Sequence, residues 1–348
     1  MNHLRDFLPS ESRLKAGFIV LIIILAMVMG SAILAQDNST QPQTFTAYYG
    51  AMGPGNIAVY AFAPTDLKVH RGDRVTWILD AESNVHFEDE RTPLFISSEV
   101  NGQQMPIFNP AAAFPTIDSG AVYTGGDVNS GTMGLVSMDQ GLKSFSLIID
   151  LEPGTYTYFC DVHVRSATIT VVPDNESIPS PAAVSEMAAL QLENAIEQGI
   201  IALADKQIEM AGQAPSSDNR VIMGLKAGDT YVRQFFPPVT IINAGESVTW
   251  EVPVGHHDSH TVTWPPMALG QVVVPVEVEG DTPVYTLGPV LRPMADSGVT
   301  VKNGQAFNGV VGDGGSYTIT FDEPGVYPYV DNLHAPGMAG VVIVMSAD

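Results

Sequence analysis

Hydrophobic and polar residues alternate along much of the chain. Residues 67–69 and 75–77 alternate on either side of a turn at Gly72, and residues 145–149 alternate before a Glu-Pro-Gly turn. A period of two indicates strands with one buried face. The 32 glycines and 25 prolines provide turns between short strands. This pattern predicts antiparallel β-sandwiches and argues against helix bundles.

The two halves of the chain repeat one another. AFAPTDLKVHRGDRVTW ends at Trp77 and FFPPVTIINAGESVTW ends at Trp250, so their Pro and Gly positions coincide when the tryptophans are aligned. Farther on, EPGTYTYFCDVH (152–163) matches EPGVYPYVDNLH (323–334) without a gap. The repeat predicts two domains of one architecture, over residues 43–173 and 219–346.

The residues between the repeats have a different pattern. Within residues 174–218, Ile178-Pro-Ser-Pro is stiff, and residues 182–210 carry apolar side chains at helical spacing around Gly199. We expect a proline-rich segment followed by a helix. This helix is either a packed spacer or a binding site for a partner.

The N-terminus contains a long apolar segment. Residues 16–35 carry no charge and follow Arg13 and Lys15. About 20 apolar residues are long enough to cross a bilayer, and basic residues stay on the cytoplasmic side. We expect residues 1–36 to anchor the chain as a single-pass membrane protein, with its bulk periplasmic or on the cell surface. The alternative is a signal peptide cleaved near Ala35, which would make the protein secreted.

The chain is strongly acidic. It has 38 Asp and Glu against 15 Lys and Arg, for a net charge of −23. Such a surface repels phosphate backbones, so we expect no nucleic-acid partner. A protein partner with a basic surface would be attracted.

The chain has one cysteine, Cys160. Exported proteins normally pair their cysteines, so Cys160 is a free thiol, an intermolecular bridge or a metal ligand. With His163 and the distant His86, it gives one thiolate and two imidazoles. Such a set suits copper in both of its oxidation states.

EPGTYTYFCDVH followed by ATITVV resembles the C-terminal copper loop of the cupredoxin superfamily, which includes plastocyanin, azurin and amicyanin. The resemblance covers residues 44–173 and 219–345. It implies an all-β protein of two tandem Greek-key cupredoxin-like sandwiches, joined by the helical linker and preceded by the transmembrane segment.

The resemblance also implies one type 1-like copper in the first domain. Cys160 and His163 match the thiolate and the C-terminal imidazole, and His86 the N-terminal imidazole. Two positions depart from the family pattern: Ser166 stands at the usual place of an axial methionine, and Phe87 stands where many members have an asparagine. The copper would then be three-coordinate, or take a carbonyl or water. The alternative is a decayed site with a leftover buried cysteine.

In the second domain Asp331 stands where the thiolate should be, so a blue copper site is impossible there. We align His260 with His86 and His334 with His163, and Met338 follows His334 by four residues. This set could hold Cu(II) or Zn(II) as an ordinary type 2 centre. The alternative is a structural domain that retains ancestral residues. His256 and His257 lie in the same VGHHDSH loop, where they are either extra ligands or, as we expect, solvated loop residues.

These observations predict one-electron transfer between the copper and a redox partner protein. The first alternative is a copper-sequestering surface protein without redox traffic. The second is a copper oxidase or nitrite reductase, which are also built from cupredoxin domains. Such enzymes have a histidine next to the cysteine ligand, where this chain has Phe159 and Asp161, and laccases need His-x-His pairs, which the sequence lacks. We therefore expect no enzyme.

Overall fold

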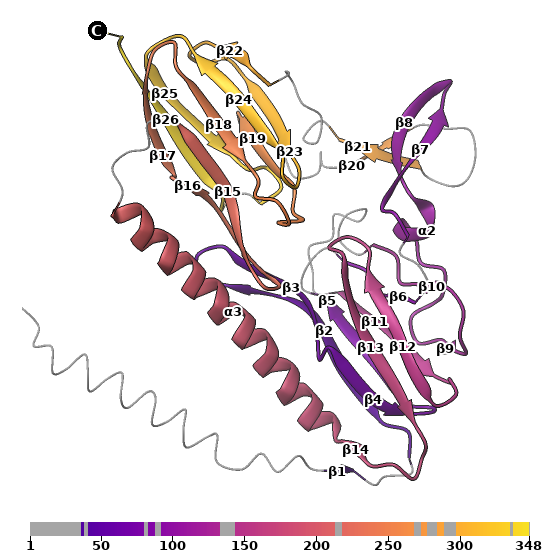
Figure 1. The fold of residues 1–348 in the computed structure, drawn as a ribbon. Coiled ribbons are helices and arrows are strands. Elements are labelled where there is room, and N and C mark those ends of the chain that lie inside the picture. Colours follow the sequence, from indigo (N-terminus) through magenta and orange to yellow (C-terminus); the bar gives the residue numbers. More distant parts are fainter. Residues whose placement is uncertain are drawn as a thin grey trace, which may run out of the picture.

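The computed structural model describes residues 36–37, 41–79, 83–87, 92–132, 143–212, 218–267, 273–276, 284–288, 297–334 and 337–347. Two β-sandwiches are spanned by one long helix, α3 (Pro181–Ala211) (Figure 1). The expected membrane anchor at residues 1–36 lies almost wholly outside the described residues, which include only Gln36 of it. Within the described ranges, no helix is both long and apolar enough to cross a membrane.

The first sandwich consists of two five-stranded layers. One layer contains β3 (Ile57–Ala63), β2 (Thr44–Gly53), β5 (Arg74–Leu79), β11 (Lys143–Ile149) and β9 (Val122–Tyr123). The other contains β10 (Val128–Asn129), β6 (His86–Phe87), β12 (Gly154–Cys160), β13 (Arg165–Val172) and β4 (Asp66–His70). Burial alternates along β5, where Val75, Trp77 and Leu79 face the core between the layers. The alternation seen in the sequence is therefore the alternation of core and surface.

The second sandwich repeats this order strand for strand. One layer contains β16 (Thr230–Phe236), β15 (Arg220–Ala227), β18 (Ser247–Glu251), β24 (Ser316–Phe321) and β22 (Val299–Val301). The other contains β23 (Phe307–Val311), β19 (His260–Trp264), β25 (Gly325–Val330), β26 (Ala339–Met345) and β17 (Val239–Asn243). Trp250 on β18 is fully buried, as Trp77 is on β5. The described part of the chain is therefore mostly β, a pair of sandwiches with the same strand order.

The two sandwiches are joined edge to edge. β3 pairs with β16 in antiparallel register, with Val59 opposite Thr230, so two five-stranded layers form one ten-stranded sheet. A second sheet also crosses between the halves. The hairpin of β7 (Phe95–Val100) and β8 (Gln103–Phe108) meets the pair β20 (Val273–Val276) and β21 (Val284–Leu287), with Ile107 opposite Thr286. The remaining elements are short: β1 (Gln36–Asp37), β14 (Ile178–Pro179) and α2 (Pro110–Ala113).

Helix α3 packs across both sandwiches. It begins after Ser180, whose Oγ accepts the N–H of Ala183 at 3.3 Å, and Pro181 takes the first helical position, where proline is tolerated. The helix contacts β2 and β3 of the first sandwich and β15 and β16 of the second. It is therefore a packed spacer that lies along the junction.

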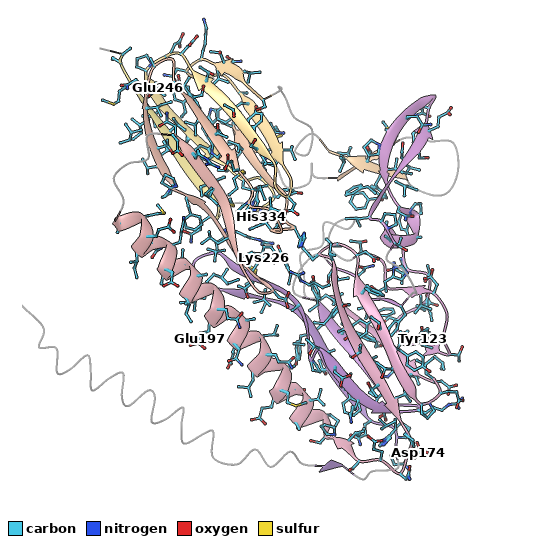
Figure 2. All side chains as sticks on the ribbon, viewed as in Figure 1. Tyr123, Asp174, Glu197, Lys226, Glu246 and His334 are labelled. Carbon is cyan, nitrogen blue, oxygen red and sulfur yellow. The ribbon has the colours of Figure 1, made fainter. Side chains whose placement is uncertain are left out.

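Gly199 lets α3 approach the junction closely. A Cβ at this position would lie 2.6 Å from Cγ2 of Thr230 and 2.8 Å from Cγ2 of Ile57. Gly199→Ala gains about 1 kcal/mol of helix propensity, but overpacking costs about 1–3 kcal/mol. We expect a net loss of stability of about 1 kcal/mol in urea unfolding. Glu197→Ala, on the exposed side of the helix (Figure 2), should change stability by less than about 0.5 kcal/mol. A Gly199→Ala protein as stable as the parent would show that this contact is loose.

Candidate metal centre

Cys160 and His163 come together at the end of β12. The strand places Cys160 in the core with none of its surface exposed, and a tight turn returns His163 toward it. Cys160 Sγ lies 3.8 Å from His163 Nδ1. The His163 ring stacks on Tyr60, with ring centroids 3.8 Å apart. The structure thus brings together two of the three residues predicted for the first copper site.

Burial sets the protonation of this pair. It raises the pKa of the Cys160 thiol above its ordinary value and lowers the pKa of His163 to about 4. Both groups are therefore neutral at pH 7 in the metal-free chain.

A buried, protonated thiol should resist alkylation. We expect native Cys160 to react with iodoacetamide at least about 1000-fold more slowly than in urea, because exposure requires an opening that costs about 5 kcal/mol or more. Mass spectrometry of timed samples measures this. Asn175→Cys adds an exposed thiol that should react at once in the same chain. Fast labelling of native Cys160 would contradict the burial.

The side chain of His86, the third predicted ligand, contacts two aspartates. Its Nδ1 lies 2.8 Å from Asp161 Oδ2 and its Nε2 lies 2.9 Å from Asp127 Oδ1. Among the described residues, one group of three or more His, Cys, Asp or Glu has all its ligand atoms within 4.8 Å, and this group contains neither His86 nor Cys160. The expected set of His86, Cys160 and His163 is therefore not assembled.

Strand register explains the misplacement. His86 pairs with Phe159 on β12, and Thr263 pairs with Val330 on β25. Phe159 and Val330 hold the same place in the repeated loop, so His86 corresponds to Thr263. Our alignment of His86 with His260 was wrong by three residues.

The residue that corresponds to His260 is Ser83. The first sandwich has a buried hydroxyl where the second has an imidazole. The asparagine expected directly after the first ligand is present as Asn84, and its Oδ1 accepts the N–H of Asp161 at 2.8 Å. Residues 85–87 and 262–264 share one pattern, in which a valine is followed by any residue and then by an aromatic residue. This shared pattern is the sequence signal for the corrected alignment.

Ser166 does not stand in an axial position. It lies opposite Phe159 on β13, whereas Cys160 lies opposite Arg165. Because neighbouring residues of a strand face opposite ways, Ser166 and Cys160 point to different sides of the sheet. Ser166 is exposed.

The second sandwich gathers histidines and carboxylates in its interior. Oδ2 of Asp331 accepts hydrogen bonds from Nδ1 of His260 at 2.6 Å and of His334 at 2.7 Å. Asp258 Oδ2 lies 3.3 Å from His334 Nε2. Asp258, His260 and His334 have ligand atoms that all lie within 4.8 Å of one another. Two imidazoles oriented by one carboxylate through their second nitrogens are typical of metal sites.

Met338 belongs to the apolar core of this sandwich and is fully buried. Its carbonyl oxygen accepts the N–H of Asp331 at 3.0 Å, which fixes the loop that carries the cluster. The structure therefore connects Met338 to the cluster through its backbone.

The cluster is charged in the metal-free chain. Burial alone would lower the pKa of His334, but the carboxylates of Asp258 and Asp331 outweigh it and raise this pKa to about 9. Burial would likewise raise the pKa of Asp258 and of Asp331, but the neighbouring histidines hold both below the ordinary value. A protonated His334 thus lies between two carboxylates, in the place where a cation is best stabilised.

His256 is the residue that the sequence analysis misjudged most. We expected a solvated loop residue, but His256 is 1% exposed. Neither of its ring nitrogens, nor Nε2 of His260, has a hydrogen-bond partner among the described residues. His257 does lie at the surface, with Nδ1 3.3 Å from Asp313. Buried nitrogens without partners are costly unless another group satisfies them.

Gly224 on β15 lets these two rings pack closely against the strand. Its φ is +80°, and a Cβ there would lie 2.7 Å from Nε2 of His256 and 3.2 Å from Nε2 of His260. Both nitrogens therefore pack against Gly224, where a side chain would clash with them. The donor types of the cluster fit a divalent metal with imidazole and carboxylate ligands.

Two side chains at the junction of the sandwiches link His163 to the cluster of the second sandwich. The guanidinium of Arg233 lies 4.9 Å from the centre of the Tyr60 ring, and its Nε lies 3.8 Å from Asp258 Oδ2. Because Tyr60 stacks on His163, Tyr60 and Arg233 connect His163 with the cluster in the second sandwich.

No family model and no curated protein matches the chain. Solved structures with similarity to it include amicyanin from Paracoccus versutus, at 23% identity over 39% of this chain and 88% of that one, with a TM-score of 0.22. A purple cupredoxin from Nitrosopumilus maritimus has 18% identity over 37% of this chain and 100% of that one, with a TM-score of 0.20. The copper-containing nitrite reductase of Thermus scotoductus has 14% identity over 88% of this chain and 68% of that one, with a TM-score of 0.20.

Proposed function

We propose that this chain is a copper-binding protein whose metal centre lies in the second sandwich and is held by Asp258, His260 and His334. The observation that carries the proposal is the convergence of these three side chains, whose ligand atoms all lie within 4.8 Å of one another. Imidazole and carboxylate ligands suit both Cu(II) and Zn(II), and such sites bind Cu(II) more tightly. Bound copper would supply a Lewis acid and a one-electron couple.

The protein groups have separate tasks in this proposal. Asp331 orients the rings of His260 and His334 through their Nδ1 atoms. Asp258 adds a negative charge on the Nε2 side of His334. A metal bound there would displace the proton that His334 carries in the metal-free chain, since a ligand nitrogen must be deprotonated.

Copper loading of the full-length chain tests the proposal. We expect one tightly bound Cu(II) per chain, with nitrogen hyperfine splitting in its paramagnetic-resonance spectrum. Release of one or more protons on binding should be measurable by calorimetry in buffers of different ionisation enthalpy. A chain that binds no copper under these conditions would exclude the proposal.

One-electron transfer is a second candidate function. It is favoured by the 3.8 Å separation of Cys160 Sγ and His163 Nδ1, since a soft thiolate with one imidazole suits Cu(I). Competition with a Cu(I) chelator in the parent and in Cys160→Ser tests it. A copper-sequestering role without redox traffic needs only the centre in the second sandwich.

The cellular setting follows from the sequence alone. We propose that the protein is anchored in the membrane by its N-terminal segment, faces the extracytoplasmic side and is not an enzyme. Its charge of −23 favours a basic partner surface. Membrane fractionation and proteinase accessibility of intact cells test this placement.

A further inference from the structure

The imidazole of His256 is a buried polar group that the proposed centre does not use. His256 is 1% exposed, and neither of its ring nitrogens has a hydrogen-bond partner among the described residues. A buried polar atom without a partner costs free energy, so it needs a group that satisfies it. A metal ion at the neighbouring cluster is such a group.

His256 lies directly beside the proposed ligands. Its ring centroid is 5.1 Å from that of His260, and the rings of His260 and His334 are 4.9 Å apart, which is nearly the same distance. The Nε2 atoms of His256 and His260 both pack against Gly224. Because Asp331 takes Nδ1 of His260, Nε2 is the nitrogen that His260 can offer to a metal. His256 therefore presents a nitrogen next to the metal-binding atom of His260.

The proposed centre has room for a fourth ligand. Three protein ligands leave a four-coordinate metal one open position, which either a water or a further side chain fills. His256 lies outside the group whose ligand atoms are all within 4.8 Å of one another, so its ring has to turn toward the metal when the metal binds. The backbone of His256 is held meanwhile, since its N–H donates to Oδ1 of Asp313 at 3.0 Å.

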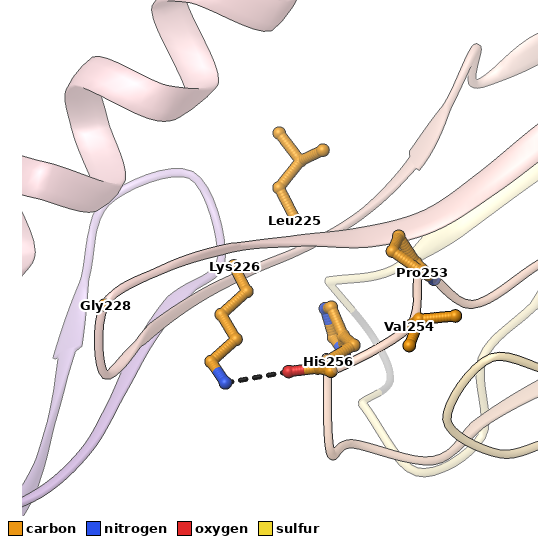
Figure 3. A pocket seen from close by; sticks show the side chains of 7 residues that line it. Leu225, Lys226, Gly228, Pro253, Val254 and His256 are labelled. Atoms are coloured by element: carbon orange, nitrogen blue, oxygen red, sulfur yellow. Dashed lines mark hydrogen bonds between the residues drawn. The ribbon is translucent and has the colours of Figure 1, made fainter.

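A pocket open to solvent lies on the other side of His256. Its volume is about 480 Å³, and Lys226, Val254 and His256 are among the residues that line it (Figure 3). The described residues that line this pocket include none of the three proposed ligands. His256 therefore separates the cluster from solvent on this side.

We propose that His256 is the fourth ligand of the metal, and that it closes the centre to water and to other external ligands. The inference rests on the proposed function and deepens it. Three imidazoles and one carboxylate without an open position suit a site that holds a metal ion, for storage or for electron transfer. They do not suit a site at which a substrate binds to the metal.

Pulsed paramagnetic resonance of the full-length chain, loaded with one Cu(II), counts the coordinated imidazoles. We expect three in the parent, and no deuterium signal from a coordinated water after exchange into heavy water. His256→Ala should show two imidazoles and a coordinated water, and should bind Cu(II) at least about tenfold more weakly. His256→Gln keeps a polar side chain of similar volume and should also show two imidazoles. His257→Ala, the matched control at an exposed neighbour, should show three.

Isotopically labelled imidazole probes the position that His256→Ala vacates. Added to this copper-loaded variant, it should replace the water and restore the third imidazole signal, and it should leave the parent unchanged. A purely structural role of His256 would not produce this rescue. Two imidazoles and a coordinated water in the copper-loaded parent would overturn the inference while the proposed function stands. Three imidazoles in both His256 variants would also overturn it. If the parent binds no copper, both proposals fail.

Discussion

His260→Ala is expected to weaken Cu(II) binding by more than about 100-fold. The imidazole of His260 is fully buried, Asp331 fixes its Nδ1, and its Nε2 has no hydrogen-bond partner among the described residues. Removing even an orienting group outside a metal site typically costs 10–100-fold in affinity, so the loss of a ligand should exceed that. Competition with a chelator of known affinity measures the change.

Two controls make this result specific. His257→Ala removes an exposed histidine three residues away and should leave the affinity unchanged. Cys160→Ser tests the first sandwich and should also leave Cu(II) affinity unchanged. Loss of Cu(II) in Cys160→Ser with retention in His260→Ala would place the metal in the first sandwich.

The metal-free chain should lose stability as the pH rises from about 6.5 to about 9. The pKa of His334 is raised to about 9 in the folded chain, against about 6.5 for an unfolded histidine. A raised folded pKa stabilises the fold fully below the unfolded pKa, and this stabilisation is lost as the pH passes through the folded pKa. The expected loss in the free energy of unfolding is about 3 kcal/mol, since each pKa unit corresponds to about 1.4 kcal/mol.

Urea unfolding at several pH values, followed by tryptophan fluorescence, measures this loss. His334→Gln cannot carry the charge, so its stability should vary much less over the same range. Bound Cu(II) should also reduce the change in the free energy of unfolding with pH, because the metal replaces the proton. A parent chain with constant stability from pH 6.5 to 9 would contradict the arrangement of His334 between Asp258 and Asp331.

The fold was largely predictable from the sequence because its signals are local. The alternation around Gly72 marked strands β4 and β5, and the repeated tryptophans marked the duplication. The apolar spacing of residues 182–210 marked the helix that the structure shows as α3. The pairing of β3 with β16 was not predictable, since edge pairing depends on which strands remain uncovered after each sandwich has formed.

The site was harder to predict because ligand identity depends on register. A shift of one residue moves a strand side chain to the other face, and the alignment of His86 with His260 was off by three. His86 consequently faces Asp161, and Ser83 takes the position of the first imidazole. Between the tryptophans and these positions the halves differ in length, which an alignment anchored on Trp77 and Trp250 cannot resolve.

His256 was missed for a different reason. A Gly-His-His-Asp run suggests an exposed turn, and nothing local distinguishes His256 from His257. The distinction comes from Gly224 on β15, a distant glycine at positive φ that leaves space for one ring. Tertiary packing alone buries His256.

X-ray absorption spectroscopy of the copper-loaded, full-length chain is the most direct test of where the metal lies. Cys160 is the only cysteine, so its sulfur reports on the first sandwich alone. The account predicts a first shell of nitrogen and oxygen scatterers with the outer-shell pattern of imidazole, unchanged in Cys160→Ser. A short copper–sulfur distance that disappears in Cys160→Ser would contradict it.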